Sequence, residues 1–355
     1  MKPTALLLLV GVATVTLAAD TNLTHAANGA GIPQPTAADT YSVTDAGRTI
    51  AVPEGMVYIP AGDFTFGAGP TARTVRLDGY AIGRFDVTNA EYKAFLDATG
   101  ATHYPPYWAQ GLYPAGKANH PVVYVSLTDA AAYCTWVSAR TGWTVKIPTA
   151  EQWEKAARGP QGYLYPWGNT PDTTYVDGVL ATKYNFNAVI AVDCLKNQPK
   201  RLVTYDREQS PFHGRQTTVD RIAAYDRAGQ ATYLEVGPTG AVRGWVNHDT
   251  WTGFIYTDLF TALNNAGGNT SAVGSYEAGK SGYGCYDMAG NVWNWCDTTI
   301  LSTNGAERGK TVNEIRGGSW YANGNSCRSV GIGEGRAASG AYNTVGFRIV
   351  MMPAG

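Results

Sequence analysis

The chain has 355 residues, of which 44% are hydrophobic, and this is enough to bury the core of one large domain or of two ordinary ones. Charged residues make up only 15% and the formal net charge is −1, which excludes a basic surface for nucleic acid or for an anionic membrane. The 42 glycines, 22 tyrosines and 10 tryptophans favour a loop-rich fold with aromatic packing over a helical bundle.

The N-terminus has the pattern of a secretory signal peptide. Lys2 precedes an apolar run from Ala5 to Ala19, which is too short for a membrane span and ends in small residues. We therefore expect residues 1–27 to hold the signal peptide and its cleavage region, and residues 28–49 to form a flexible leader. The mature chain is predicted to be exported (secreted, periplasmic or at the cell surface) and to have no integral membrane segment.

The first elements after the leader are predicted to be short strands followed by a helix. Met56–Gly62 and Asp63–Gly67 have the composition of two strands around a turn, and the alternating run Val75–Phe85 predicts another strand. The sequence Thr88–Glu91 has the pattern of a capping box, which predicts a helix that ends at Gly100.

Two further helices are predicted downstream. The first runs from Thr128 to Arg140 and is expected to bury Ala132, Trp136 and Ala139, which recur at helical spacing. The second begins at another capping box, Thr149–Gln152. These helices, set among many short strands, indicate the α+β class.

Residues 170–268 differ in composition from the sequence on either side and are predicted to be an insertion. Within it, the runs Ala231–Val236 and Gly244–Trp251 alternate as strands do. We therefore expect a single domain at residues 50–355 that is interrupted by this insertion.

Several blocks of the sequence resemble the formylglycine-generating enzyme family, which is also called the sulfatase-modifying factor family. They occur in the family's order from about Met56 to the C-terminus, except for Asn169–Gly268. The resemblance implies a C-type-lectin-like fold with few helices and many short irregular strands. The blocks are MVYIPAGDFTFG, VRLDGYAIGRFDVTNAEYKAFLDATG, HPVVYVSLTDAAAYCTWVSARTGWTVKIPTAEQWEKAARG, YPWGN, AVGSYEAGKSGYGCYDMAGNVWNW, RGGSW and VGFRIV.

The copper-dependent oxidases of this family use two cysteines, at the third and eighth positions beyond the serine of the RGGS strand. Paired thiolates suit a soft Cu(I) ion, so both are needed. The matching positions here are Ala322 and Cys327. The resemblance therefore implies that one ligand is missing, and we expect neither a copper site nor catalysis. Cys327 would be the catalytic residue only if the chain were an oxidase in spite of this substitution.

The family's YDxxGNxWEW turn supplies a calcium ion with side-chain and backbone oxygens, which are the hard ligands that calcium prefers. The matching positions here are Asp287, Gly290, Val292 and Asn294. Asn294 replaces a glutamate, so its amide oxygen can still be a ligand but brings no charge. The resemblance implies a calcium site at these four positions, and a metal-free turn is the alternative.

The segment Tyr321–Thr344, between the RGGSW and VGFRIV blocks, consists mostly of Gly, Ala, Ser, Asn and Tyr. It resembles the variable segment of proteins that are diversified by retroelements, in which such a cassette is rewritten at Asn codons. Tyrosine supplies rigid contact area and the small polar residues adapt, as in other binding surfaces. The residues expected on this binding face are Tyr321, Asn323, Asn325, Ser326, Gly331, Ile332, Glu334, Ser339, Tyr342 and Asn343.

The resemblance therefore implies a non-catalytic, exported ligand-binding protein with a variable C-terminal face. Its expected partner is a protein or glycan on another surface. Two alternatives stay open. One is a copper-dependent oxidase of a cysteine side chain, and the other is a structural protein of the cell envelope, which the near-neutral charge and the long insertion would allow.

Overall fold

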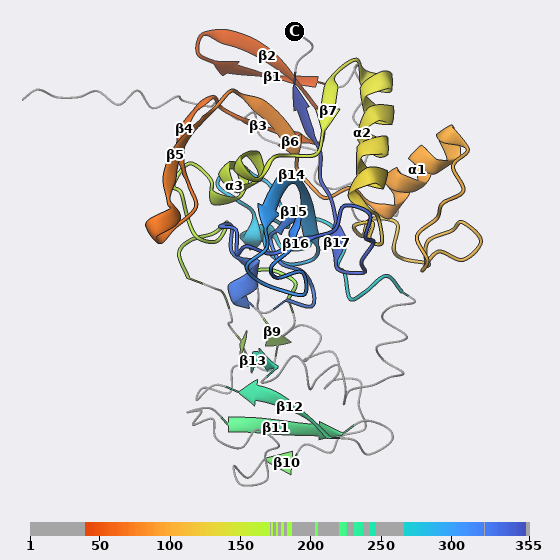
Figure 1. The fold of residues 1–355 in the computed structure, drawn as a ribbon, viewed down its shortest axis with the longest axis vertical. Coiled ribbons are helices and arrows are strands. Elements are labelled where there is room, and N and C mark those ends of the chain that lie inside the picture. The colour runs from red at the N-terminus through yellow and green to blue at the C-terminus, as the bar shows by residue number, and fades with distance from the viewer. Residues whose placement is uncertain are drawn as a thin grey trace, which may run out of the picture.

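The structure is a computed structural model that describes residues 40–170, 172, 183–186, 266–322 and 324–352, and the backbone of six short strands between Tyr175 and Trp245. Three α-helices and many short strands form the expected α+β fold in this part of the chain (Figure 1). No helix among the described residues is both long and apolar enough to cross a membrane.

A four-stranded antiparallel sheet in the order β3-β6-β18-β7 joins the two ends of the domain. Its C-terminal strand lies between strands from the first half of the chain, and Val350 is opposite both Ile82 and Lys146. The last block of the sequence therefore closes the fold. The strands are β3 (Met56–Ile59), β6 (Tyr80–Gly83), β7 (Thr144–Lys146) and β18 (Val350–Met352).

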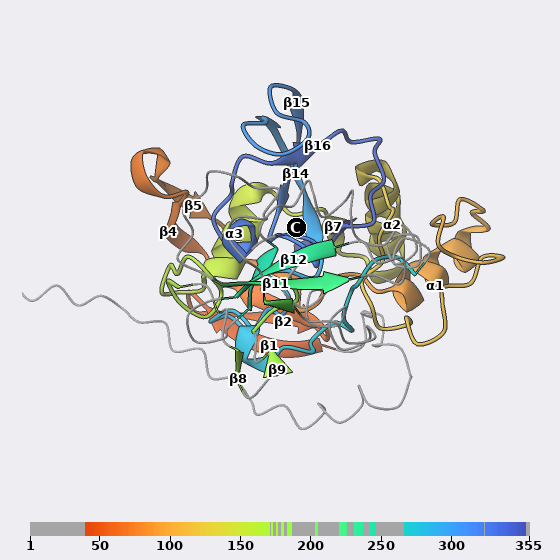
Figure 2. The ribbon, with the colours of Figure 1, turned by 90° about the horizontal axis from the view of Figure 1, so that it is seen from below.

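A second four-stranded sheet has the order β16-β15-β14-β17, with β17 parallel to β14 and the other pairs antiparallel. Only the first four residues of β14 are buried, and the remainder alternates in exposure. Figure 2 shows the outer end of the β14–β15 hairpin at the edge of the molecule. The strands are β14 (Trp293–Leu301), β15 (Thr311–Arg316), β16 (Gly335–Arg336) and β17 (Val345–Gly346).

The three helices begin at capping boxes. Thr88 and Glu91 cap α1 (Asn89–Thr99), and Thr149 and Gln152 cap α3 (Ala150–Arg158), as the sequence predicts. The helix α2 (Leu127–Thr141) has a third box, formed by Ser126 and Asp129, which was not predicted from the sequence.

The predicted buried face of α2 is wrong by about one position. Ala132 and Ala139 are exposed and Trp136 is half-buried. The helix instead buries a neighbouring stripe, because its tyrosine and valine bring more apolar area to the core than the two alanines do. That stripe consists of Ala130, Tyr133, Cys134, Val137 and Thr141.

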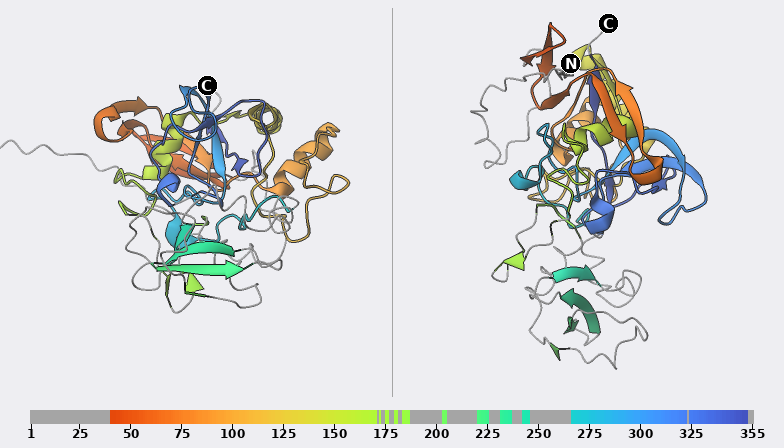
Figure 3. Two further views of the ribbon diagram at one scale, coloured as in Figure 1. Left: turned by 60° about the horizontal axis from the view of Figure 1, so that its bottom comes forward. Right: turned by 90° about the vertical axis from the view of Figure 1, so that its left-hand side faces the viewer.

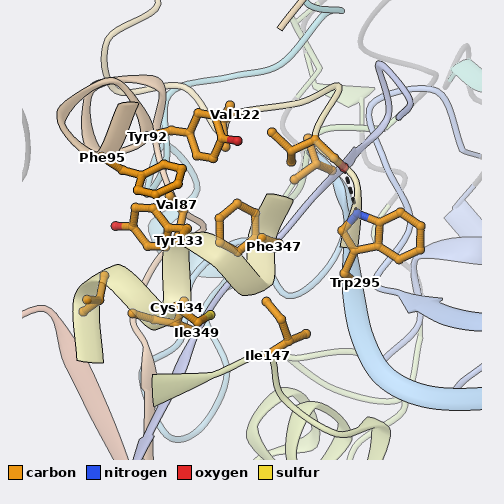
Figure 4. Packing of buried hydrophobic residues seen from close by; sticks show 14 of the residues in the cluster. Val87, Tyr92, Phe95, Val122, Tyr133, Cys134, Ile147, Trp295, Phe347 and Ile349 are labelled. Carbon is orange, nitrogen blue, oxygen red and sulfur yellow. Dashed lines mark hydrogen bonds between the residues drawn. The ribbon is translucent and has the colours of Figure 1, made fainter. Parts of the chain in front are cut away.

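The main hydrophobic core lies between these helices and the two sheets. Figure 4 shows Tyr92, Phe95 and Tyr133 from α1 and α2 around Phe347, which follows β17. The rings of Tyr133 and Phe347 meet edge to face, with centroids 5.4 Å apart. Trp295 of β14 closes the cluster and donates a hydrogen bond of 3.0 Å from Nε1 to the backbone oxygen of Val125.

The N-terminal part of the fold differs from the sequence prediction in two ways. The hairpin of β1 (Thr40–Asp45) and β2 (Arg48–Pro53) begins ten residues before the expected domain start at residue 50. The run Val75–Phe85 is not one strand but parts of two, β5 (Arg73–Leu77), which pairs with β4 (Gly62–Phe66), and β6. Burial alternates along β5, whereas all four residues of β6 are buried, so the two strands belong to different sheets.

The predicted insertion holds short two-stranded and four-stranded sheets. The expected strand Ala231–Val236 is confirmed as β12, whereas Gly244–Trp251 only overlaps the next strand, β13. Figure 3 shows the four-stranded sheet β10-β11-β12-β13 on the side of the molecule away from β1 and β2. The strands are β8 (Tyr175–Val176), β9 (Val179–Leu180), β10 (Val203–Thr204), β11 (Asp220–Tyr225), β12 (Ala231–Val236) and β13 (Val242–Trp245).

Part of the predicted insertion belongs to the core of the main domain. Tyr184 and Phe186 are almost completely buried, and their rings stack with centroids 4.3 Å apart. Asn185 between them forms a bridge with Gly290 of the predicted calcium turn. The surrounding residues differ in composition from the rest of the domain, so this short buried segment was not recognised in the sequence.

Candidate functional site

The C-terminal segment Tyr321–Thr344 lies over a buried network of charged side chains. Arg316, at the end of β15, forms ion pairs with Glu154 of α3 at 2.6 Å and with Glu314 at 2.8 Å. Glu154 also pairs with Arg158 at 3.0 Å and accepts a hydrogen bond from the backbone of Gly67. The charge of Arg316 is therefore balanced inside the protein by two carboxylates.

A second buried network holds the start of β14 to the last strands. Arg348 pairs with Asp86 at 2.8 Å, and both side chains are completely buried. The Nε of Arg348 also donates to Asn294 Oδ1 at 2.7 Å, and a second donor, Trp153 Nε1, reaches the same oxygen at 2.8 Å. The Asn294 amide nitrogen donates to Asp86. All of the polar groups of the Asn294 side chain are therefore used inside the protein.

This geometry tests the calcium prediction at Asn294. The amide oxygen faces two N–H donors, one of which belongs to a cationic guanidinium, and a calcium ion cannot take the place of either donor without breaking the network. Asn294 therefore does not fit as a calcium ligand in this arrangement. The calcium site stays a prediction for the remaining oxygens of the turn.

The other three predicted ligands lie in the turn that precedes β14. Asp287 is buried, accepts a hydrogen bond of 2.8 Å from the backbone of Gly274, and has its pKa raised to about 7 by burial and by the nearby Asp86. Gly290 has a positive φ of 74°, and a Cβ there would lie 2.1 Å from a backbone oxygen of Asn185.

Val292 is different, because its side chain belongs to the hydrophobic core. Any contribution from it to a metal site comes from its backbone oxygen. The structure thus brings Asp287, Gly290 and Val292 into one turn and gives Asn294 another role. Among the described residues, no group of three His, Cys, Asp or Glu side chains is placed to hold a metal ion.

The structure describes both positions that the resemblance assigns to copper ligands, Cys327 and Ala322. Cys327 is completely buried, and burial raises the pKa of its thiol to about 12. A Cβ on Gly318 would lie 2.3 Å from its sulfur, so the thiol fills the space beside the RGGS strand. Ala322 packs as a half-buried side chain against the main core. The four cysteines that the structure describes are all free and buried, and Cys194 lies outside the described residues.

The predicted binding face divides into surface positions and buried ones. Asn325 and Ser339 are exposed, and five more side chains are half-buried: Tyr321, Ser326, Ile332, Tyr342 and Asn343. Asn323 lies outside the described residues. Figure 1 shows the segment as blue loops beside β16 and β17.

Two of the predicted contact residues have structural positions instead. Glu334 is 9% exposed and pairs with Arg336 at 2.6 Å, and its backbone oxygen accepts from Ile315. A Cβ on Gly331 would lie 2.4 Å from Glu314 Oε1 and 2.7 Å from Arg316 Nη2. Gly331 therefore lies directly on the buried ion pairs, where a side chain would displace a charge partner.

Fixed parts of the domain hold the segment at both ends. Near its start, the Tyr165 hydroxyl donates to the Gly324 oxygen at 3.3 Å. In its middle, the backbone nitrogen of Ser329 donates to the Leu164 oxygen at 2.8 Å. At its end, the backbone nitrogen of Tyr124 donates to the Tyr342 oxygen at 2.9 Å. The exposed positions of the segment are thus carried by a rigid support, as binding loops commonly are.

The tyrosines that border the end of the segment were not predicted from the sequence. Tyr124 has a positive φ of 58°, which is uncommon for a bulky side chain and places it beside Tyr342. Its ring lies 6.0 Å from that of Tyr107, in a group of aromatic residues from the loop at 101–116. The sequence did contain an indication of this aromatic group, because the loop at 101–116 is rich in aromatic residues and has no Asp, Glu, Lys or Arg.

The family described as the sulfatase-modifying factor enzyme 1-like domain matches residues 43–200 and 222–353. This chain belongs to that family. The resemblance found in the sequence blocks is therefore confirmed, and with it the C-type-lectin-like fold. The matched ranges also include part of the predicted insertion, in agreement with the buried position of Tyr184 and Phe186.

Curated relatives include formylglycine-generating enzymes. The mouse enzyme is 31% identical over 182 residues, which are 37% of this chain and 47% of the enzyme. The enzyme of Thermomonospora curvata is 35% identical over 169 residues, which are 33% of this chain and 54% of the enzyme. The chain thus spans about half the length of these relatives.

A third relative is similar over a longer stretch. It is the mouse protein named inactive C-alpha-formylglycine-generating enzyme 2, which is 26% identical over 348 residues, or 82% of this chain and 84% of the relative.

Two solved structures are also similar. PvdO from Pseudomonas aeruginosa has a TM-score of 0.49 and 21% identity, and the match covers 83% of this chain and 93% of PvdO. The Treponema denticola variable protein 1 has a TM-score of 0.46 and 16% identity, with 88% and 99% of the two chains covered.

Proposed function

We propose that this protein is a non-catalytic, exported ligand-binding protein that uses the family's fold as a scaffold. The observation that carries the proposal is the chemistry of the two residues at the positions that the resemblance assigns to copper ligands. One is Ala322, and the other is a thiol that is completely buried and has a pKa raised to about 12. A protonated, enclosed thiol with no thiol at the paired position is a poor ligand for Cu(I).

The arrangement of the C-terminal segment supports a role in binding. Its surface positions are small, polar or aromatic, and hydrogen bonds from Tyr165 and Tyr124 hold both ends of the segment. Such a surface can change its contact residues while the support below stays fixed. The expected partner is a protein or a glycan on another surface.

The similarity to a mouse protein that is named as inactive is compatible with a scaffold role. Export is proposed from the signal-peptide pattern at residues 1–27. Copper-dependent oxidation of a cysteine side chain remains the competing proposal, because curated enzymes of the family match part of the chain.

A Cu(I) titration of the purified, reduced mature chain against a competing chelator separates these two proposals. We expect no stoichiometric binding beyond that of a Cys327→Ser control. Tight binding that the control loses would contradict the scaffold proposal, because it would show that another residue replaces the missing thiolate.

A display experiment tests the binding face itself. In one library, six surface positions of the segment are varied, namely Tyr321, Asn325, Ser326, Ser339, Tyr342 and Asn343. In the comparison library, only three positions of the middle of the segment are varied, namely Ser329, Gly331 and Glu334. We expect most members of the first library to resist proteolysis and most of the second to be cleaved. Equal loss of folding in both libraries would mean that the segment is not a tolerant surface.

The genome offers an independent test of diversification. A near-copy of the DNA for residues 316–348, beside a reverse-transcriptase gene and with Asn codons at the differing positions, is the expected finding. Without such a copy, the face would be a fixed binding surface and not a diversified one.

A further inference from the structure

The loop between β14 and β15 contains an asparagine followed by a glycine, Asn304 and Gly305, and both residues are exposed. The loop is at the outer end of the β14–β15 hairpin, at the edge of the molecule (Figure 2). Glycine has no Cβ, so other atoms can approach its backbone nitrogen closely. The Gly305 nitrogen donates a hydrogen bond of 2.8 Å to Oδ1 of Asn304. The side-chain amide of Asn304 is therefore folded over the peptide nitrogen that follows it.

Ser302 contacts the same peptide unit through its oxygen. The residue is buried, and its hydroxyl lies 2.8 Å from the backbone oxygen of Asn304 and 3.1 Å from that of Gly333. A hydroxyl has one proton to donate, and the shorter contact is the one to Asn304. A hydrogen bond to this oxygen stabilises the anion that forms when the N–H of Gly305 ionises, because nitrogen and oxygen of a peptide unit share the charge. The Gly305 nitrogen is thus easier to deprotonate and lies beside a carbonyl group that it can attack.

We propose that Asn304 is a site of spontaneous deamidation and that Ser302 promotes the reaction. The deprotonated Gly305 nitrogen attacks Cγ of Asn304, a nitrogen–carbon bond forms, and the bond from Cγ to Nδ2 breaks. The proton from Gly305 passes through solvent to the departing nitrogen, which leaves as ammonia. Water then opens the five-membered imide at either carbonyl and leaves an aspartate or an isoaspartate. No oxidant or reductant is needed, and the inference does not depend on the ligand-binding function.

The modified position helps to hold the middle of the C-terminal segment. The backbone nitrogens of Thr303 and Asn304 donate to the Gly333 oxygen at 2.8 and 3.0 Å. A Cβ on Gly305 would lie 2.6 Å from Oε1 of Glu334, so this glycine packs directly against the carboxylate. Isoaspartate lengthens the main chain beside Gly305, and either product adds a negative charge at a position that is bridged to Glu334. Both changes weaken the contact between the loop and the segment.

The test follows the purified mature chain over weeks in mildly alkaline buffer, with peptide mass spectrometry of each asparagine. We expect Asn304 to deamidate at least about ten times faster than Asn325, which is also exposed but precedes a serine, whose Cβ obstructs the attack. The same rates are measured in guanidinium chloride. Asn304 should react at least as fast in the folded chain as in the unfolded one, because only the folded chain has the hydrogen bond from Ser302.

Two variants separate the roles of the residues. Ser302→Ala, checked for its native circular dichroism, should slow the reaction of the folded chain about fivefold, which is the effect of losing one hydrogen bond, and leave the unfolded rate unchanged. Asn304→Gln should resist deamidation, because its longer side chain closes a less favourable ring, and it keeps the second Asn–Gly pair at 323–324. Hydrogen exchange at Thr303 should accelerate as the wild-type chain ages and stay constant in Asn304→Gln.

Three results would overturn the proposal. Deamidation of Asn304 that is no faster than that of Asn325, or that is slower in the folded chain than in the unfolded one, would show that the fold does not expose a reactive site. An unchanged rate in folded Ser302→Ala would remove the role of the hydroxyl. Constant hydrogen exchange at Thr303 in fully deamidated protein would show that the segment does not depend on this loop.

Discussion

The middle of the C-terminal segment and its two flanks differ in what lies beneath them. The middle, from Cys327 to Gly335, covers the ion pairs of Arg316 and contains most of the segment's buried residues. The flanks, at residues 321–326 and 337–343, include most of the segment's exposed positions and are held mainly through backbone hydrogen bonds. A backbone bond does not depend on the side chain, so the flanks can vary in sequence where the middle cannot.

The largest expected effect is that of removing the charge beneath the middle. Glu154→Gln leaves Arg316 and Arg158 without their shared carboxylate in the interior, and breaking a buried ion pair costs about 3–5 kcal/mol. Chemical denaturation measures the loss. The matched control is Glu307→Gln, which breaks a surface pair with Lys310 and should cause no measurable change. Similar effects of the two variants would contradict the comparison.

A smaller loss is expected at Gly331. The new side chain in Gly331→Val would enter the space of Glu314 and Arg316, and such overpacking costs about 1–3 kcal/mol. Ala337→Val, at an exposed position of the same segment, is the matched substitution and should shift the thermal midpoint little. If Gly331→Val unfolded at the wild-type temperature, the middle would be as tolerant as the flanks.

Calcium should have a still smaller effect on the turn before β14. Asn294 is engaged by Trp153 and Arg348, so only Asp287 and backbone oxygens remain for the ion. We expect a weak site, with a gain on the order of 0.5 kcal/mol near its dissociation constant. Thermal unfolding with calcium and then with EGTA measures this gain, which Asp287→Asn should abolish. A gain of several kcal/mol would show that Asn294 leaves its network to bind the ion.

The smallest effects are expected on the flanks. Asn325→Tyr and Ser339→Tyr change exposed side chains, and each should alter the free energy of unfolding by about 0.5 kcal/mol or less. Urea denaturation of both variants gives the values. A loss above about 2 kcal/mol in either variant would mean that the flank packs more tightly than its exposure indicates.

Local signals in the sequence predicted the helices well and their packing less well. The capping boxes at Thr88 and Thr149 mark true helix starts, because a cap depends on residues only three positions apart. The buried face of α2 was shifted, since alanines and Trp136 fit helical spacing as well as Tyr133 and Val137 do. The sheet that completes the core, not the spacing, decides between two such neighbouring stripes.

In the candidate site, the sequence predicted the surface positions correctly but not the positions whose partners are distant along the chain. The segment Tyr321–Thr344 and most of its surface positions were found from composition, which a binding surface constrains directly. Glu334 and Gly331 were misplaced, because their partners, Arg336, Arg316 and Glu314, meet them only through the pairing of β15 with β16 and the fold around it. Asn294 was assigned from the family's turn, and its competing donors come from α3 and the end of the chain.

The sequence alone determined the family, the helix caps at Thr88 and Thr149, and the alanine at position 322, where the resemblance implies a cysteine. These features depend on the order and type of nearby residues. The tertiary structure decided which side chains are buried together: the burial of Cys327 against Gly318, and the use of Asn294 by Arg348 and Trp153. Burial and charge balance are properties of groups that are distant along the chain, so they exist only after the chain has folded.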